Sequence, residues 1–200
     1  MAIELFATRT EDKQERTESR RFLRVPVAPI DEIDPVLVGV DRAEQVILPG
    51  GGVPRYVPRT ADARLRETVR AALDGEPWII VVRGVAKVGK SRSLFEAVRA
   101  ASQWASIDLV APANGKALES LLTPGVGLRL PRGRAVLWLD DLEPFLDDGV
   151  TLQRLHEWHA GVRGRIVAAT YGGKGAALVR GSRTTGLSTI AQQVLQHPPR

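Results

Sequence analysis

The feature that most constrains the fold of this chain is an apolar run followed directly by a short segment with a glycine at its first and sixth positions. Residues 78–82 read Trp-Ile-Ile-Val-Val, which is typical of a strand buried on both faces of a parallel sheet. Residues 84–91 read Gly-Val-Ala-Lys-Val-Gly-Lys-Ser, the complete pattern G-x-x-x-x-G-K-[ST]. Apolar residues then recur at helical spacing, at Leu94, Phe95 and Val98. The sequence therefore predicts a strand, a phosphate-binding loop and a helix, in that order.

Each residue type in this loop has a physical role in holding a phosphate. Gly84 and Gly89 permit backbone dihedral angles that a side chain would forbid, so successive N–H groups converge on an anion at a helix N-terminus. Lys90 would reach the terminal phosphates, and the Ser91 hydroxyl would coordinate Mg²⁺. The alternative is a glycine turn that binds nothing. We expect the nucleotide to contact the whole loop and the residue after it: Gly84, Val85, Ala86, Lys87, Val88, Gly89, Lys90, Ser91 and Arg92.

Composition excludes several other kinds of site. Of the 200 residues, 44% are hydrophobic and 26% are charged, as expected of a globular domain with a sizeable core. The chain holds no cysteine, which excludes disulfide bonds and thiolate metal sites. His156 and His159 have the i, i+3 spacing of a metal-binding pair, but no third ligand is evident in the sequence. We therefore expect these two histidines to lie on a solvated helix face.

Hydropathy and charge bear on compartment and partners. No apolar run approaches the ~18 residues of a membrane span, and the first residues lack the apolar core of a signal peptide. We therefore expect a cytoplasmic protein with no membrane partner. The net charge is +5, and residues 51–200 hold 21 basic and 13 acidic side chains. A basic region of this kind is compatible with nucleic-acid binding, but its arginines are scattered, which favours an ordinary solvated surface.

Polarity and glycine content divide the chain into three parts. Residues 1–20 are polar and mixed in charge, and we expect them to form a disordered tail. Residues 21–54 are expected to be an extension, with an edge strand at 22–27 and a Pro-Gly-Gly-Gly-Val-Pro linker at its end. The nucleotide-binding domain is expected to span 55–200, to begin near Arg55 and to be truncated at its C-terminus.

Helix and strand signals alternate after the linker. The spacing of apolar residues predicts strands over 107–110, 135–139 and 165–170, and helices over 61–73, 117–122 and 152–158. Thr60 and Thr151 are the expected N-caps of two of these helices. Residues 187–197 suggest either a further helix or a last strand. Alternation of this kind favours an α/β fold with a mostly parallel sheet covered by helices on both faces.

The second half of the predicted site lies where the strand over 135–139 ends. Asp140 follows this buried strand directly, and open α/β sheets bind ligands at the carboxyl ends of their strands. Its carboxylate would hold the Mg²⁺ shell together with Ser91. Asp141 is the candidate to orient or deprotonate an attacking water, with Glu143 in reserve. The alternative for the two aspartates is helix capping.

Further polar side chains follow the next strand. Thr170 ends the strand over 165–170, where its hydroxyl would sense a γ-phosphate; a strand-end threonine whose hydrogen bonds are all internal is the alternative. Lys174, Arg180 and Arg183 are candidate phosphate-facing cations, with an ordinary surface position as the alternative.

Taken together, the motifs GVAKVGKS, VLWLDDLE and RIVAAT resemble the nucleotide-binding domain of the STAND class of AAA-related P-loop ATPases. The stretches DPVLVGVDRA and RYVPRTADARLRETV resemble, more narrowly, the ATPase region of actinobacterial regulatory proteins that often carry tetratricopeptide repeats. The resemblance implies a three-layer P-loop NTPase fold with five strands, in which the Thr170 strand separates the other two motif strands. It also places residues 56–59 near the adenine. The chain departs from the pattern in having no recognisable sensor-arginine module and in having Asp rather than Glu at position 141.

The function expected from this reading is an ATP-binding switch domain that hydrolyses ATP slowly with Mg²⁺. It would transmit its nucleotide state to further domains of a longer protein or to a second copy of itself. Two alternatives remain open at this point. A P-loop kinase would need an arginine-rich lid, for which Arg129, Arg132 and Arg134 are the candidates. A basic nucleic-acid-binding module would use the positive charge of residues 51–200.

Overall fold

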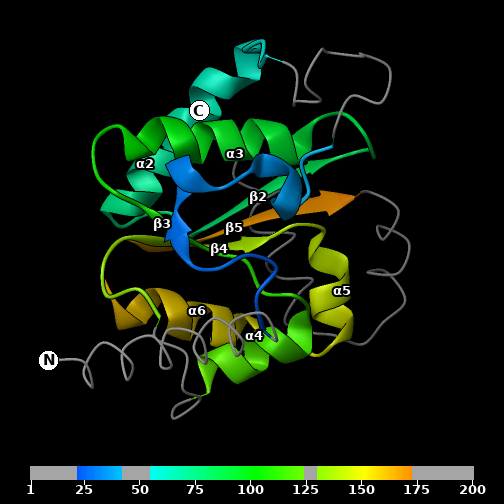
Figure 1. The fold of residues 1–200 in the computed structure, drawn as a ribbon, viewed down its shortest axis with the longest axis vertical. Coiled ribbons are helices and arrows are strands. Elements are labelled where there is room, and N and C mark those ends of the chain that lie inside the picture. The colour runs from blue at the N-terminus through cyan, green and yellow to red at the C-terminus, as the bar shows by residue number, and fades with distance from the viewer. Residues whose placement is uncertain (1–21, 42–54, 124–129, 173–200) are drawn as a thin grey trace, which may run out of the picture.

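The computed structural model describes residues 22–41, 55–123 and 130–172 of the chain. In these residues a five-stranded, mostly parallel sheet is covered by helices on both faces (Figure 1). The prediction of an α/β fold with a helix-covered sheet is therefore confirmed. In this part of the chain no helix combines the length and the apolar character needed to cross a lipid bilayer. The predicted tail over 1–20, the linker over 49–54 and the element over 187–197 lie outside the described residues.

The sheet has the strand order β1-β3-β4-β5-β2. Its strands are β1 (Ala28–Pro29), β2 (Ile79–Gly84), β3 (Asp108–Val110), β4 (Ala135–Leu139) and β5 (Arg165–Gly172). All neighbours are parallel except β1, which runs antiparallel to β3 at the edge. The strand β5, which carries Thr170, thus lies between β2 and β4, in the order that the resemblance implies. The carboxyl ends of these three strands meet at one edge of the sheet, because parallel strands point the same way.

Two layers of helices cover this sheet. On one face lie α2 (Thr60–Asp74) and α3 (Lys90–Ser102), and on the other lie α4 (Gly115–Leu122), α5 (Leu142–Asp147) and α6 (Leu152–Gly161) (Figure 1). The helix α5 falls where the sequence analysis expected only a loop. It forms because Leu142 and Phe145 are both buried against the sheet.

Strand β4 shows how the two cores are divided. Val136 and Trp138 belong to the hydrophobic cluster under α2 and α3, whereas Leu137 and Leu139 belong to the cluster under the opposite helices. This division follows from the period of two in a β-strand, which sends successive side chains to opposite faces. Every residue of β4 is buried, and a strand placed in this way needs the uninterrupted apolar run that the sequence contains.

The N-terminal segment over 22–41 belongs to the same packed body. Ile30 and Val38 are fully buried in the cluster under α2 and α3, and the backbone N–H of Arg24 donates to the carbonyl of Ala111 at 2.8 Å. The edge strand lies at Ala28–Pro29 rather than over 22–27. The packed unit thus begins well before the boundary expected near Arg55, because the apolar residues of this segment find their partners in the sheet.

Candidate functional site

The loop after β2 turns through two residues with positive φ. Lys87 has φ 62° and Gly89 has φ 83°, and α3 begins at the next residue. A Cβ on Gly89 would lie 3.0 Å from the Arg59 guanidinium, so the position has little room for a side chain. The loop itself opens to solvent, with Val85 68% exposed. A backbone loop that is exposed and leads into a helix N-terminus has the form of an anion cradle.

Two side chains at the start of α3 point in the directions that a nucleotide site requires. Lys90 folds back across the loop, and its Nζ donates to the carbonyl of Val85 at 3.0 Å. Ser91 donates from its hydroxyl to Oδ1 of Asp140 at 2.6 Å. The structure therefore brings together the serine of the loop and the acid at the end of β4, which are 49 residues apart in the sequence.

Asp140 is a partly buried carboxylate with several polar neighbours. Its Oδ1 also accepts a hydrogen bond from the hydroxyl of Thr170 at 3.0 Å. Burial raises the pKa of Asp140 above its ordinary value, and the charge of Asp141 acts in the same direction. Hydrogen bonds from Ser91 and Thr170 and the positive charge of Arg24 oppose this rise without cancelling it. A partly buried carboxylate beside a second acid would be stabilised in its charged form by a bound cation.

Asp141 and Thr170 are joined through the backbone. The N–H of Asp141 donates to the Thr170 hydroxyl at 2.9 Å, and Asp141 has φ 54°. Within the described residues, Lys87 and Asp141 are the two non-glycine residues with positive φ, and both lie at this edge of the sheet. Such conformations cost about 1–3 kcal/mol and concentrate at functional sites. The hydroxyl of Thr170 both donates and accepts here, as in the alternative reading of a strand-end threonine with internal hydrogen bonds.

Glu143, the reserve candidate for activating water, is tied to the end of β5. Its Oε1 accepts a hydrogen bond from the backbone N–H of Gly172 at 2.7 Å. Its Oε2 is buried and has no hydrogen-bond partner among the residues that the structure describes. Asp141 is exposed beside it. The geometry therefore favours Asp141 over Glu143 as the side chain that a water molecule would meet.

The segment before α2, which the resemblance places near the adenine, contacts the loop through Arg59. Nη1 of Arg59 donates to the carbonyl of Val88 at 2.7 Å, and the Tyr56 hydroxyl bonds Ser93 of α3 at 2.9 Å. The N-cap of α2 is Arg59 rather than Thr60, because the side chain of Asp62 accepts from the Arg59 N–H. Residues 56–59 thus lie beside the loop.

The Arg92 side chain contacts the next turn of its own helix and the Tyr56 ring. Its guanidinium pairs with Glu96 at 2.7 Å and lies 5.6 Å from the centre of the Tyr56 ring. The sequence grouped this residue with the nucleotide contacts, and the structure places its charge on the Tyr56 side of α3.

Sequence reasoning missed Gly39, which lies directly against Asp140. Gly39 has φ 94°, and a Cβ built on it would overlap the Asp140 carboxylate. The only signal in the sequence was a lone glycine between two apolar residues, Val38 and Val40, a pattern that can mark a close backbone approach.

The other candidates lie elsewhere or outside the described residues. Arg134 precedes β4, at the opposite end of the strand from Asp140, and pairs with Asp74; Arg132 lies in the same connection. Arg129, Lys174, Arg180 and Arg183 are outside the described residues.

The two histidines of α6 pack on an aromatic ring. His159 stacks on Trp78 with ring centres 5.9 Å apart, and His156 meets the same ring edge-on at 5.3 Å. The Nδ1 atom of His159 is hydrogen-bonded to the carbonyl of Arg165 at 2.7 Å. In the described part of the chain, no group of three or more His, Cys, Asp or Glu side chains is placed to hold a metal ion.

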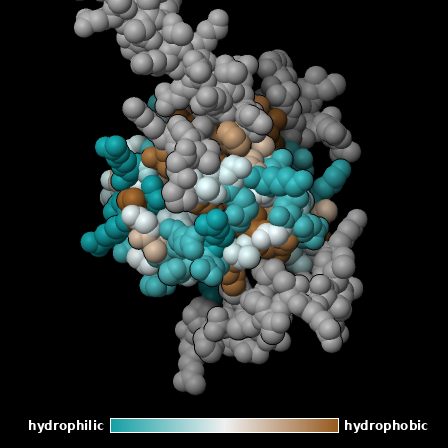
Figure 2. Space-filling model, turned by 90° about the horizontal axis from the view of Figure 1, so that it is seen from below, coloured by the Kyte–Doolittle hydropathy of each residue, from teal (hydrophilic) through white to brown (hydrophobic). Residues whose placement is uncertain are grey.

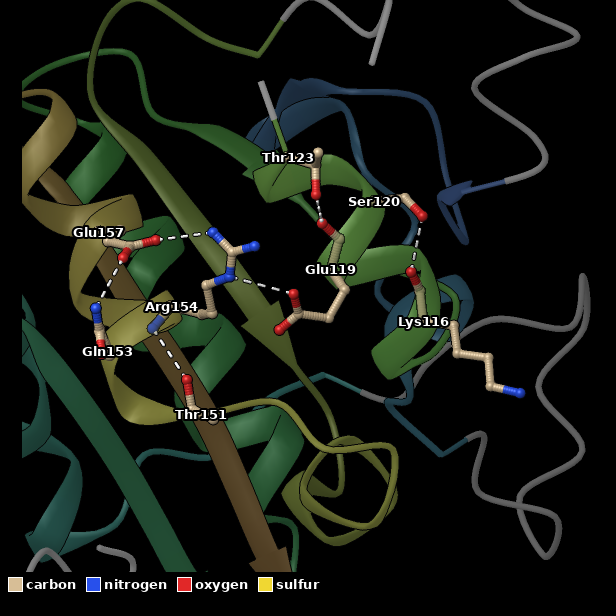
Figure 3. Close-up of polar contacts among 8 residues, drawn as sticks. All are labelled: Lys116, Glu119, Ser120, Thr123, Thr151, Gln153, Arg154 and Glu157. Carbon is tan, nitrogen blue, oxygen red and sulfur yellow. Dashed lines mark hydrogen bonds and ion pairs between the residues drawn. The ribbon is translucent and has the colours of Figure 1, made fainter. Parts of the chain in front are cut away.

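A polar hollow lies between α4 and α6. Its lining comprises Glu119, Gly149, Thr151, Gln153, Arg154 and Glu157. Figure 3 shows Arg154 between the two glutamates, with Nε 3.2 Å from Glu119 and Nη1 3.0 Å from Glu157. Figure 2 views the molecule from the side of these helices, where hydrophilic residues are interspersed with smaller hydrophobic patches. The charges of this hollow are thus already paired with one another.

Comparisons of the chain with family models, with curated proteins and with solved structures find no match. The function is therefore inferred from the geometry of the site.

Proposed function

We propose that this domain binds ATP with Mg²⁺ at the carboxyl edge of the sheet, hydrolyses it slowly and acts as a nucleotide switch. The observation that carries the proposal is the meeting of Ser91 and Asp140 at 2.6 Å, beside the exposed loop over 84–91. A loop serine and a strand-end acid in contact across the ends of β2 and β4 are what a P-loop NTPase fold requires.

The donor set suits Mg²⁺. The ion prefers oxygen ligands and is typically held by one or two carboxylates together with the phosphates of a substrate. The Ser91 hydroxyl and the Asp140 carboxylate would provide the protein's share of these ligands. When bound, Mg²⁺ neutralises charge on the phosphates and on the leaving group. The raised pKa of Asp140 supports this assignment, because burial leaves its charge poorly compensated in the unliganded chain.

The phosphates would be held by the loop amides and Lys90. The Lys90 ammonium bonds a neutral carbonyl, that of Val85. A hydrogen bond between two charged groups is roughly twice as strong as a neutral one. Lys90 would therefore exchange Val85 for a phosphate oxygen.

Asp141 would position the attacking water. Its carboxylate is exposed, while its backbone is fixed by the hydrogen bond to Thr170. The side chain of aspartate is one methylene shorter than that of glutamate, so its carboxylate extends less far toward the attacking water. A shorter side chain at this position accords with slow hydrolysis and with a switch rather than a rapid enzyme. The adenine would lie near residues 56–59, because Arg59 joins this segment to the loop at Val88. The nucleotide state would pass to further domains of a longer protein or to a second copy.

The test is a titration of the purified chain with ATP, GTP and ADP, with Mg²⁺ and with EDTA, followed by a phosphate-release assay on the same sample. We expect ATP to bind more tightly with Mg²⁺ and to release phosphate slowly. Transfer of labelled phosphate to an acceptor other than water would indicate a kinase instead. Salt-dependent DNA binding that Lys90→Ala leaves unchanged, with no binding of ATP, would indicate a nucleic-acid-binding module.

A further inference from the structure

A short turn from the N-terminal segment crosses the end of β4. Residues Pro35–Val38 form a 3-10 helix. Asp34 is its N-cap, and Oδ1 of Asp34 accepts a hydrogen bond from the Val36 N–H at 3.0 Å. The helix ends at Gly39, which caps it in a left-handed conformation. We call residues 34–39 the strap. It falls within the stretch DPVLVGVDRA, but the three motifs assigned to the site, GVAKVGKS, VLWLDDLE and RIVAAT, do not include it.

The strap is anchored to the strand that carries Asp140. Val38 is fully buried, and its carbonyl accepts a hydrogen bond from the indole N–H of Trp138 at 2.8 Å. Trp138 lies two residues before Asp140 in β4, and its ring packs edge-on against Phe95 of α3. The position of the strap is therefore set by the same strand and helix that build the proposed site.

The strap and the site hold Asp140 from two sides. Ser91 and Thr170 both bond Oδ1 of its carboxylate. The open face of Gly39 lies against the other oxygen, Oδ2, at a distance that leaves no space for a Cβ. A side chain at position 39 would displace the carboxylate from the orientation in which it accepts from Ser91.

We propose that Gly39 is a positioning residue, and that the strap fixes the Asp140 carboxylate in the orientation that a divalent cation needs. The inference rests on the proposed function and extends the site to residues about 50 positions before the phosphate-binding loop. Nucleotide binding without Mg²⁺ does not involve the strap, because the loop amides and Lys90 are separate from it. The strap thus affects only the part of the affinity that Mg²⁺ supplies.

The test compares two glycines with similar positive φ angles. Gly39 has φ 94° and lies against Asp140, whereas Gly149 has φ 89° and has no atom within 4 Å of a Cβ placed on it. Gly39→Ala and Gly149→Ala therefore introduce similar backbone strain, and only the first introduces a clash. The affinity for a non-hydrolysable ATP analogue is measured by calorimetry in Mg²⁺ and in EDTA for both variants and for the unaltered chain.

We expect Gly39→Ala to lose roughly tenfold or more of the gain in affinity that Mg²⁺ gives, as for a lost interaction with a charged group. Its affinity in EDTA should match that of the unaltered chain. Gly149→Ala should keep both values. If Gly39→Ala keeps the full gain from Mg²⁺, the strap has no positioning role, although the proposed function stands. If the unaltered chain shows no such gain, the proposed function fails and the inference fails with it.

A second pair of variants covers the case in which Gly39→Ala does not fold. Trp138→Phe removes the hydrogen bond that anchors the strap and introduces no clash. Trp158→Phe removes a comparable buried bond, from its indole to the carbonyl of Ile166 at 3.3 Å, on the opposite face of the sheet. We expect the gain from Mg²⁺ to fall in Trp138→Phe and to persist in Trp158→Phe. Equal gains in the two variants would overturn the proposal.

Discussion

The carboxyl edge of the sheet and the hollow between α4 and α6 are both polar, yet they differ in how their charges are compensated. In the hollow, Arg154 lies between Glu119 and Glu157, so that opposite charges meet at the solvent boundary. At the edge, Asp140 is partly buried beside Asp141, and its pKa is raised. The carboxylates of the hollow thus share a guanidinium at the solvent boundary, whereas the Asp140 carboxylate is partly buried and its pKa stays raised.

Backbone conformation separates the two regions in the same way. Lys87 and Asp141 are the non-glycine residues with positive φ in the described part of the chain, and both lie at the carboxyl edge of the sheet. Glycine takes the left-handed position in the hollow, at Gly149, where no steric cost arises. Backbone strain and a partly buried acid with a raised pKa thus separate the carboxyl edge from the hollow.

The largest expected effect comes from removing the cation of the loop. Lys90→Ala should weaken ATP binding roughly 10- to 100-fold, the range for a hydrogen bond to a charged group. Lys116→Ala removes the same charge from α4, near the hollow (Figure 3), and should leave the affinity unchanged. Calorimetric titration of both variants measures the difference. Equal affinities would remove the distinction between the two regions.

The second prediction concerns Asp62 of α2, a buried carboxylate that accepts hydrogen bonds from Tyr56 and from the Arg59 backbone. Burial alone would raise its pKa, but hydrogen bonds from Tyr56 and Arg59 lower it below the ordinary 3.8. The stability that Asp62 contributes is therefore present above pH 3.8 and is lost as the pH falls through its folded pKa. Asp62→Ala should cost about 1–2 kcal/mol at pH 7, the range for losing a helix cap. Urea denaturation at pH 7 and at pH 3 measures it, and a cost that does not shrink at pH 3 would contradict the assignment.

The third prediction is that Asp140 affects stability with the opposite pH dependence, because its pKa is raised whereas that of Asp62 is lowered. A raised pKa means that the fold favours the protonated form, so stability is lost as the pH rises from 3.8 through the folded pKa. Asp140→Asn should therefore melt at the same temperature as the unaltered chain at low pH, and at a higher temperature at neutral pH when no ligand is present. Thermal melts across this pH range test it. A lower melting temperature for the variant at neutral pH would show that the carboxylate is already well compensated.

The smallest expected effect is that of Arg154→Ala. Its ion pairs with Glu119 and Glu157 lie at the surface, where salt screens them and side-chain entropy offsets them. The melting temperature should fall only slightly, and less so in high salt, while ATP binding stays unchanged. A loss of ATP affinity in this variant would mean that the hollow takes part in binding.

The central strands β4 and β5 and the helix after the loop were predictable because they are buried in a regular way. Strand β2 was expected to be buried on both faces, but it lies at the edge of the described sheet, where Ile80 is its one buried residue. In the sequence, β2, β4 and β5 each contain an uninterrupted apolar run. Asp140 and Thr170 stand at the ends of two of these runs, and Ser91 ends the pattern G-x-x-x-x-G-K-[ST], so all three could be found from neighbouring residues alone. In the structure the hydroxyls of Ser91 and Thr170 both donate to Oδ1 of Asp140.

The strap was not predictable in the same way. It is a single 3-10 turn with no amphipathic period, and its partner Trp138 lies 100 residues further along the chain. Helix α5 was missed because it has six residues and contains Pro144, so its pattern is too short to show a period of 3.6. In both cases the conformation is decided by tertiary contacts rather than by local sequence.

The most direct test of the account is the binding of a non-hydrolysable ATP analogue to the unaltered chain and to Asp140→Asn, each in Mg²⁺ and in EDTA. The account predicts that Mg²⁺ tightens binding to the unaltered chain and that Asp140→Asn loses this gain while it keeps its affinity in EDTA. If the unaltered chain binds no nucleotide, or binds it equally well in Mg²⁺ and in EDTA, then Ser91 and Asp140 do not form a nucleotide-linked metal site and the account is contradicted.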